Sequence, residues 1–299
     1  MNLKQLEYFV RVAELGSFSK AAMVLNIAQP ALSRQVRLLE TELHVTLLIR
    51  NGRGVVLTEV GNRLFKHSIG ILQLAEHAIQ DIEAARNEPF GRITLGLPPS
   101  MSRRLTPSLV DAFCRVLPKA RLSIVEGLST HLIEWIATGR VDLGLVYNAE
   151  SNLALDVAPV LDESLGLVSL ARRDDRKAKT VPFFRLPEYP LILPQRGHAL
   201  RKLIETQAAL AGLKLNIAFE VSGIPSILDL VAAGYGHAVL TQASIAASNQ
   251  PQTFILRPFE APSLSSTLSL ATSARKPVTP LIRQAAGLLR QLITHKKLL

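Results

Sequence analysis

Apolar residues in the first part of the chain repeat with the spacing of short helices. Residues 4–13 place four apolar side chains on one helical face, and Gly16 ends that segment. The next segment, "SFSKAAMVLN", offers Ser17 or Ser19 as an N-cap. A third helix begins at Gln29, and its apolar residues are Ala31, Leu32, Val36, Leu39 and Leu43. Two short helices joined by the tight turn "NIA" predict a helix-turn-helix, and the strand-like "LLIRNGRGVVLT" predicts a wing.

A longer helix is predicted over residues 58–86, which contain no proline and two glycines. Thr58 followed by Glu59 suits its start. Mostly small residues form a seam at four- and three-residue spacing: Gly61, Leu64, Ser68, Ile71, Ala75, Ala78, Ile82 and Ala85. About 30 residues span roughly 45 Å, too long for a small domain to cover. We expect the helix to pair with its copy, the alternative being a helix packed on its own chain. The segment "NEPFG" ends it as a linker.

From residue 92 the pattern changes to apolar strands that alternate with helical segments. The strands are "RITLGL", "RLSIVE", "DLGLVY" and "KLNIAFEV", and the helices lie near 103–116, 130–138, 199–211 and 225–233. This alternation predicts an α/β fold with largely parallel sheets. Such sheets bind ligands at the carboxyl ends of their strands.

Length and composition indicate at least two domains in a reducing compartment. The chain has 299 residues and a single cysteine, Cys114, so no internal disulfide is possible. The start "MNLKQLEYF" has no apolar signal-peptide core, and no long uncharged apolar run predicts a transmembrane helix. We therefore expect a cytoplasmic protein with no membrane partner. The net charge of +10 favours polyanions, but residues 1–88 carry only +1 and residues 89–299 carry +9.

Several segments together resemble the LysR-type transcriptional regulators along the whole chain. The most specific is "LEYFVRVAELGSFSKAAMVLNIAQPALSRQVRLLETEL", followed by "GRGVVLTEVG", with "GRVDLGLV", "GHALR" and "LDLVAAGYGHAVL" in the second half. The resemblance implies three parts: a winged helix-turn-helix (1–58), a linker and dimerisation helix (59–88), and an effector-binding domain (89–299). Its two lobes, similar to those of periplasmic binding proteins, are about 91–161 with 266–299, and about 162–265.

The chain departs from the family pattern at two positions. Ala28 stands where the family often has Ser or Thr, so a cap of the third helix, worth about 1 kcal/mol, is missing. His44 stands where glycine is common at the exit of that helix. If this residue is left-handed, histidine carries a strain that glycine avoids.

The third helix carries side chains suited to reading base edges. Gln29 suits an adenine edge or a phosphate, and Arg34 suits a fork to guanine O6 and N7. Pro30 belongs in the first helical turn and offers its ring to a thymine methyl. Ser33 and Arg37 suit phosphates, and Arg53 in the wing suits the minor groove or the backbone. The alternative for an isolated arginine is a solvated helix face, but the whole array favours contact with double-stranded DNA.

The resemblance also implies an effector cleft between the lobes. Ser100 follows the first strand at a helix start, and Ser129 occupies the equivalent place on the next strand, where helix dipoles favour anions. The implied effector-binding residues are Ser100, Met101, Ser129, Pro194, Gln195 and Ser222. Nearby arginines at 103, 104, 196 and 201 favour a small carboxylate or another anion. The alternatives are that the serines only cap helices and that the arginines are solvated.

An enzyme is not predicted. Cys114 lies in an amphipathic helix and is expected to be buried, and the histidines have no metal-ligand spacing. No nucleophile elbow, P-loop or dinucleotide motif is present, so we expect no catalytic residue, cofactor or metal. A periplasmic solute receptor would need a signal peptide.

The prediction is an effector-controlled regulator that binds promoter half-sites as a homodimer or homotetramer, with RNA polymerase as a partner if it activates. Pairing by the linker helices would bring two recognition helices to successive turns of the major groove. The alternative is an effector-independent, nitrogen-control-like regulator or a simple repressor with a non-functional cleft.

Overall fold

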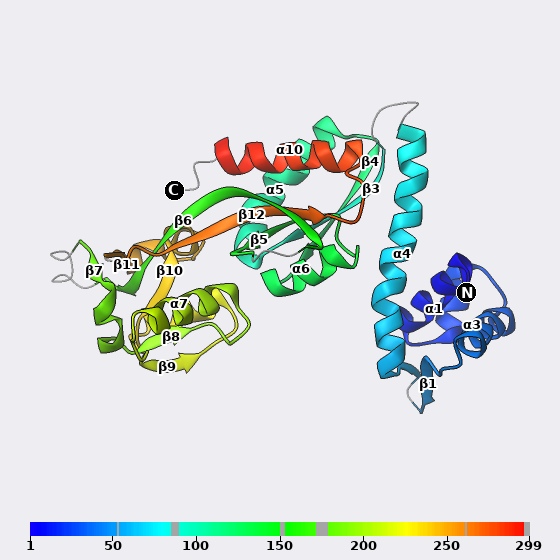
Figure 1. Cartoon of the computed structure of the whole chain (residues 1–299), viewed down its shortest axis with the longest axis horizontal. Coiled ribbons are helices and arrows are strands. Elements are labelled where there is room, and N and C mark those ends of the chain that lie inside the picture. The colour runs from blue at the N-terminus through cyan, green and yellow to red at the C-terminus, as the bar shows by residue number, and fades with distance from the viewer. Residues whose placement is uncertain (53, 85–89, 150–152, 172–178, 261, 296–299) are drawn as a thin grey trace. The chain divides into compact units, whose positions relative to one another are not determined.

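The computed structural model describes residues 1–52, 54–84, 90–149, 153–171, 179–260 and 262–295 (Figure 1). The chain divides into two compact units. The first comprises Met1–Glu88 and Thr138–Arg140, and the second comprises Pro89–Ala137 and Val141–Leu299. No helix in the described part of the chain is long and apolar enough to cross a membrane.

The first unit is built from four helices and a hairpin. The elements are α1 (Leu3–Leu15), α2 (Phe18–Leu25), α3 (Gln29–Leu43), β1 (Leu48–Asn51), β2 (Gly54–Leu57) and α4 (Glu59–Ala84). The two strands pair antiparallel, with Leu48 opposite Leu57. The first three helices share one apolar core with the hairpin and the start of α4. The predicted winged helix-turn-helix and long helix are therefore confirmed.

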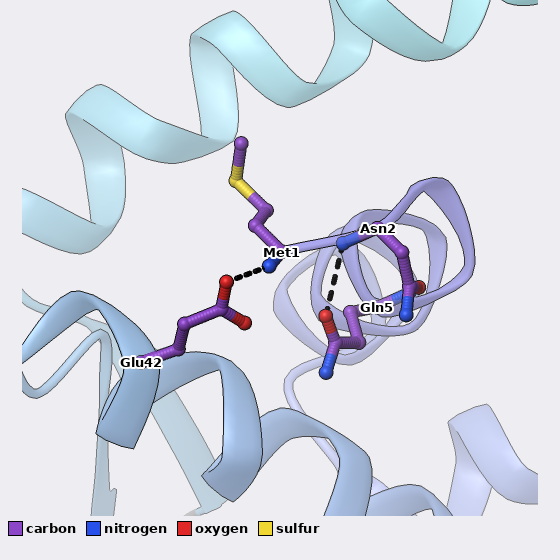
Figure 2. A network of polar contacts seen from close by, with 4 residues as sticks. All are labelled: Met1, Asn2, Gln5 and Glu42. Carbon is purple, nitrogen blue, oxygen red and sulfur yellow. Dashed lines mark hydrogen bonds and ion pairs between the residues drawn. The ribbon is translucent and has the colours of Figure 1, made fainter.

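Local capping explains where these helices begin and end. Asn2 and Gln5 form a reciprocal capping box at the start of α1, and Figure 2 shows the bond from the Asn2 N–H to the Gln5 side chain. Gly16 ends α1 at φ 60°, in the left-handed region that glycine tolerates. Ser17, rather than Ser19, caps α2 by accepting from the Lys20 N–H. Thr58 Oγ1 accepts from the Gly61 N–H at 2.8 Å as α4 begins.

The wing touches α1 through a backbone contact that requires glycine. Gly54 has φ 138°, and the Val55 N–H donates to the Gly16 carbonyl oxygen at 2.9 Å. A Cβ added to Gly54 would stand 2.6 Å from that oxygen. A larger residue there would push the hairpin away from α1.

The buried face of α3 is narrower than the sequence pattern indicates. Leu32, Val36 and Leu39 are buried and Leu43 is half-buried, as expected. Ala31 is exposed, contrary to the prediction, because it lies about 100° around the helix from Leu32. The remainder of the helix surface carries mainly polar side chains, together with Ala31 and the exposed Leu38.

Glu40 fixes the wing to α3. Its Oε1 accepts from the Leu47 N–H at 2.7 Å and from the Leu48 N–H at 3.1 Å, where the chain leaves the helix for β1. Both donors lie in a partly buried position, so they lose their partner if the carboxylate is removed. The neighbouring Glu42 instead pairs with the exposed amino terminus of Met1, as Figure 2 shows.

Glu40→Ala is expected to lower the free energy of unfolding by about 2 kcal/mol, because it leaves two partly buried backbone donors without an acceptor. Glu42→Ala, the matched control, is expected to cost less than about 1 kcal/mol because its ion pair is exposed. Urea unfolding of the full-length variants measures both. Equal losses would show that Glu40 does not anchor the wing.

The second unit combines a large mixed sheet with a small parallel one. Its helices are α5 (Pro99–Val116), α6 (Ser129–Ala137), α7 (Ala199–Leu210), α8 (Ile224–Ala232), α9 (Gln242–Ala246) and α10 (Pro280–His295), with 3₁₀ turns η2 (Phe183–Glu188) and η3 (Pro251–Thr253). Its strands are β3 (Gly91–Leu97), β4 (Ala120–Glu126), β5 (Leu143–Tyr147), β6 (Leu155–Leu170), β7 (Val181–Pro182), β8 (Leu191–Leu193), β9 (Ile217–Glu220), β10 (Ala238–Thr241), β11 (Phe254–Glu260) and β12 (Ser265–Ser273).

The large sheet has the order β4-β3-β5-β12-β6-β11-β7, and β10 also pairs with β6. The pairs β3–β4, β3–β5, β7–β11 and β8–β9 are parallel, whereas β6 runs antiparallel to β10, β11 and β12, and β5 runs antiparallel to β12. The prediction of largely parallel sheets is therefore wrong in detail. The long strands β6 and β12 run side by side through the unit (Figure 1).

The apolar residues of this unit form separate clusters around the two long strands. One cluster gathers around β3, α5 and α10 and a second around α6 and β5, while a third gathers around β8, α7, α8 and β10. The α/β class with an N-terminal helical region is confirmed.

Candidate DNA interface and ligand cavity

The polar face of α3 does not pack against the apolar core of the first unit. Arg34 and Arg37 are exposed, as is Pro30, and Gln29 is half-buried at the first residue of the helix. The apolar face of α3 holds the helix against α1 and α2, so these side chains project from a fixed support. Ala28 gives no side-chain cap, as its residue type predicts.

Ser33 is held by an arginine that the sequence pattern does not single out. Arg50 Nη2 in β1 donates to Ser33 Oγ at 3.3 Å, and the Arg50 guanidinium lies 4.8 Å from the centre of the Phe18 ring. Arg50 therefore joins the wing to α3 and α2 while remaining exposed. Arg53, the predicted wing contact, lies outside the described residues.

His44 adopts the left-handed conformation at the end of α3, with φ 54° and ψ 33°. Its Cβ makes this conformation costly, whereas glycine has no such penalty. His44→Gly is expected to raise the free energy of unfolding by up to about 1 kcal/mol, since part of the gain is offset by glycine's greater freedom when unfolded. Thermal unfolding checks this. A loss of stability would show that the His44 side chain makes a stabilising contact.

Helix α4 carries both packed and exposed apolar residues. Leu64, Phe65, Ile69 and Leu72 pack on the core of the first unit. The exposed apolar residues are Val60, Ile71, Leu74, Ala78 and Ile79.

The predicted seam is packed in the first turns of α4 and exposed further along the helix. Gly61 and Ser68 are buried and Leu64 is half-buried against the same chain, whereas Ile71 and Ala78 are exposed. The self-packed alternative therefore holds for the first turns of the helix. The side chain of Ile82, and Ala85 altogether, lie outside the described residues.

A cavity of about 450 Å³ opens in the second unit where four helices begin. Its wall includes the first residues of α5, α6, α7 and α8 together with the residues just before them. The body of the wall is apolar, with Leu128, Ile224, Leu228 and Phe254, and its hydroxyl-bearing residues are serines, Thr241 and Tyr147. Helix α7 is capped by His198, whereas α5 and α8 have no side-chain cap.

Three of the predicted effector-binding residues, Ser100, Ser129 and Ser222, line this cavity. The other three do not. Met101 is 1% exposed within the core beneath α5, because it lies about 100° around the helix from Ser100. Pro194 is buried with its carbonyl bonded to Arg201, and Gln195 is exposed away from the wall.

A polar chain leads from the cavity into the interior. Ser129 Oγ accepts from the Tyr147 N–H at 2.9 Å, and the Tyr147 hydroxyl donates to Glu163 Oε2 at 2.8 Å. Arg104 Nη1 lies 4.0 Å from Glu163 Oε1. Burial raises the pKa of Glu163, while the hydrogen bond from Tyr147 and the charge of Arg104 oppose that rise. Burial and then the Glu163 charge raise the pKa of Tyr147.

The cationic rim predicted for the cavity is only partly present. Arg103 lines the wall and donates to Asn249 Oδ1 at 3.1 Å. Arg201 is 1% exposed and pairs with Glu205 at 2.8 Å and with Glu220 at 3.1 Å. Its charge is therefore balanced by these two glutamates, and Arg201 does not line the cavity. Burial lowers the pKa of His198, whose Nδ1 accepts from the Leu200 N–H, which leaves the proton of the neutral ring on Nε2.

Cys114 is exposed, contrary to the prediction. The buried apolar positions of α5 are Met101, Leu105, Leu109 and Phe113, and Cys114 follows one residue later on the outer side.

Two family models match the chain. The model for the bacterial regulatory helix-turn-helix protein of the lysR family matches residues 3–62, and the LysR substrate binding domain matches residues 86–293. A nitrogen assimilation regulatory protein from Klebsiella aerogenes is 31% identical over all of this chain and 97% of its own length. The regulator BbuR from Bordetella bronchiseptica is 31% identical over 81% of this chain and 74% of its own length.

Solved structures agree on the fold. A full-length OxyR variant from Pseudomonas aeruginosa aligns with a TM-score of 0.78 and 25% identity, covering 100% of this chain and 96% of that one. Full-length CbnR in complex with its target DNA aligns with a TM-score of 0.70 and 24% identity, covering 98% and 100%. From its winged helix-turn-helix to its ligand-binding unit, the chain belongs to the LysR family of transcriptional regulators.

Proposed function

We propose that this regulator reads promoter DNA with Gln29, Pro30 and Arg34 and positions the duplex with Ser33 and Arg37. The observation that carries the proposal is the exposed polar face of α3, supported from behind by Leu32, Val36 and Leu39 and from the side by the wing. Arg34 has the forked donors that match guanine, whereas Ser33 is already bonded to Arg50 and suits a phosphate contact.

The DNA part of the proposal is tested by titrating the full-length protein onto duplex from upstream of its own gene and onto random duplex. Specific regulators bind their site at least about a thousandfold tighter than unrelated sequence at physiological salt. We expect such a ratio, and we expect the weaker binding to random duplex to fall steeply as salt is raised. Equal affinity for the two duplexes would contradict sequence-specific reading.

Pairing through α4 supplies the two-fold symmetry that two half-sites require. The exposed apolar residues of α4 belong to a helix that is already held on its own domain through Leu64, Phe65, Ile69 and Leu72. Two such sets of residues exclude water when they pack together, and the pair then places two recognition helices on one side of the duplex. CbnR, a structural neighbour, has been solved with its target DNA. We propose a homodimer through α4 and a homotetramer through further contacts of the second unit.

The cavity of the second unit is the proposed effector site, and a small carboxylate is the proposed effector. Helices α5 and α8 begin at the cavity without a side-chain cap, so first-turn N–H groups such as those of Ser100 and Ile224 remain available. These groups and the helix dipoles favour a negative charge. The open apolar cavity favours this account over a regulator with a non-functional cleft.

Effector binding acts by shifting the equilibrium between two assemblies that bend DNA differently. A ligand achieves this only through different affinities for the two states. We further propose that the chain works in the cytoplasm with its parts divided at 1–58, 59–88 and 89–299, and that it contacts RNA polymerase if it is an activator. No catalytic step, cofactor or metal enters this function.

A further inference from the structure

Asn148 follows β5 in the left-handed backbone conformation, with φ 48°, and its side chain clamps β12. Its N–H donates to the Thr267 carbonyl at 2.8 Å, and its Oδ1 accepts from the Thr267 N–H at 2.9 Å. Its Nδ2 donates to Ser266 Oγ at 3.0 Å. Because the Thr267 N–H can only donate, it fixes which end of the Asn148 amide faces Ser266. Ser266 therefore accepts a hydrogen bond from the fold.

Ser129 is held in the same way by Tyr147, the residue before Asn148. Its Oγ accepts from the Tyr147 N–H at 2.9 Å. Ser129 and Ser266 are 6% and 3% exposed, and both line the cavity. A serine hydroxyl has one hydrogen, and in the described part of the structure neither hydroxyl has an acceptor for it. Two buried O–H groups are thereby left to donate to a molecule in the cavity, which removes the cost of leaving them unpaired.

Two hydroxyl donors anchored on consecutive residues suit a group with two acceptor oxygens. A carboxylate has two such oxygens and no hydrogen, whereas a carboxamide has one oxygen and brings two N–H donors. Ser100, at the uncapped start of α5, adds a backbone N–H to the same wall. The Tyr147 hydroxyl is not a further donor, because its hydrogen is donated to Glu163.

The rest of the wall suits an apolar body without a second charge. The cavity volume of about 450 Å³ lies in the range that encloses ligands of drug size. Leu128, Ile224, Leu228 and Phe254 contribute apolar surface. Asp229 is an exposed carboxylate in the lining and disfavours a second anionic group. The cavity therefore suits an acid with one carboxylate and an extended apolar body.

We propose that Ser129 and Ser266 donate their hydroxyl hydrogens to the carboxylate oxygens of the effector, and that the effector is a monocarboxylic acid with an apolar body. Asn148 is a positioning residue, because it acts on the ligand only through Ser266. The inference rests on the proposed role of the cavity as effector site.

Three matched probes test the proposal by calorimetry on the full-length protein: hexanoate, hexanamide and acetate. Each hydrogen bond to a charged acceptor contributes about tenfold in affinity, so hexanoate should bind about a hundredfold more tightly than hexanamide. Hexanoate should also bind more tightly than acetate, because its longer chain buries more apolar surface. Ser266→Ala removes one donor and should reduce the preference over hexanamide to about tenfold. Ser266→Thr keeps the hydroxyl and should restore the preference.

Control variants separate this effect from a change in folding. Ser164→Ala removes the hydroxyl of an exposed serine in β6 outside the lining and should leave the preference unchanged. Asn148→Gly tolerates the left-handed conformation but deletes the amide, so Ser266 is no longer held and the preference should fall. When Ser266→Ala is already present, Asn148→Gly should change the preference no further, which a merely structural role of Asn148 would not produce. Site-specific DNA binding by each variant shows that it is folded.

The proposal is overturned if hexanamide or acetate binds the wild-type protein as tightly as hexanoate, or if Ser266→Ala retains the full preference. If neither hexanoate nor acetate binds although the protein still recognises its DNA site, both this inference and the carboxylate effector fail while the regulator function stands. Loss of site-specific DNA binding in the wild type would instead contradict the proposed function itself.

Discussion

Arg34→Ala is expected to weaken binding to the specific DNA site by about 1–3 kcal/mol, between roughly fivefold and 150-fold, and to change binding to random duplex much less. The side chain is exposed on the first half of α3, and among the described residues it forms no hydrogen bond or ion pair with its own domain. A forked guanidinium placed on a guanine edge discriminates between bases, whereas the same charge on a phosphate does not. Fluorescence anisotropy on the two duplexes measures both affinities.

Arg37→Ala is the matched control, since it removes the same group one turn further along the same face. We expect it to weaken specific and random binding alike and to reduce the salt dependence by the equivalent of about one phosphate contact. If Arg34→Ala also lowers both affinities equally, Arg34 contacts only phosphate and the base-reading role assigned to it is wrong.

Two carboxylates placed on the exposed face of α4 are expected to separate the dimer. In the variant that combines Ile71→Glu with Ala78→Glu, like charges from two chains would meet in an apolar contact, and burying them without partners is costly. Because a single chain reaches only one half-site, the affinity for the full site should fall by several orders of magnitude. Sedimentation equilibrium and DNA titration together test this.

Asn62→Glu provides the control, because Asn62 is exposed on the side of α4 opposite Ile71. That variant should keep both its oligomeric state and its DNA affinity. An unchanged oligomer in the variant with Ile71→Glu and Ala78→Glu would exclude this face as the dimer interface.

Much of the first unit could be predicted from sequence because its signals are local. Ser17 and Thr58 cap helices through bonds three residues along the chain, and Gly16 ends α1 by its own backbone conformation. The three- and four-residue spacing of Leu32, Val36 and Leu39 likewise fixes the buried face of α3. Such features need no knowledge of what lies elsewhere in the fold.

Three of the wrong predictions share a cause, which is the angular position of a residue around its helix. Successive residues of a helix lie about 100° apart around its axis, so one can be buried and the next exposed. Ala31 and Cys114 are exposed next to a buried residue, and Met101 is buried next to a residue that faces the cavity. Arg201 was expected at the cavity rim, but two glutamates that a sequence pattern does not pair with it hold it inside.

The polar chain behind the cavity lies beyond sequence reasoning for a different reason. Tyr147 ends β5 and Glu163 lies in β6, and their contact depends on β12, which pairs with both strands. Arg104 reaches the same carboxylate from α5. No spacing in the sequence indicates that these three side chains meet, so their contact emerges only from the fold.

The most direct test of the account is a footprint of the full-length protein on DNA upstream of its own gene, recorded without and with hexanoate as a small carboxylate. The account predicts protection of separated half-sites in excess random DNA, and a changed extent of protection when the acid is added. Absence of specific protection would contradict DNA reading through α3. An identical footprint with and without the acid would contradict control by such a ligand in the cavity.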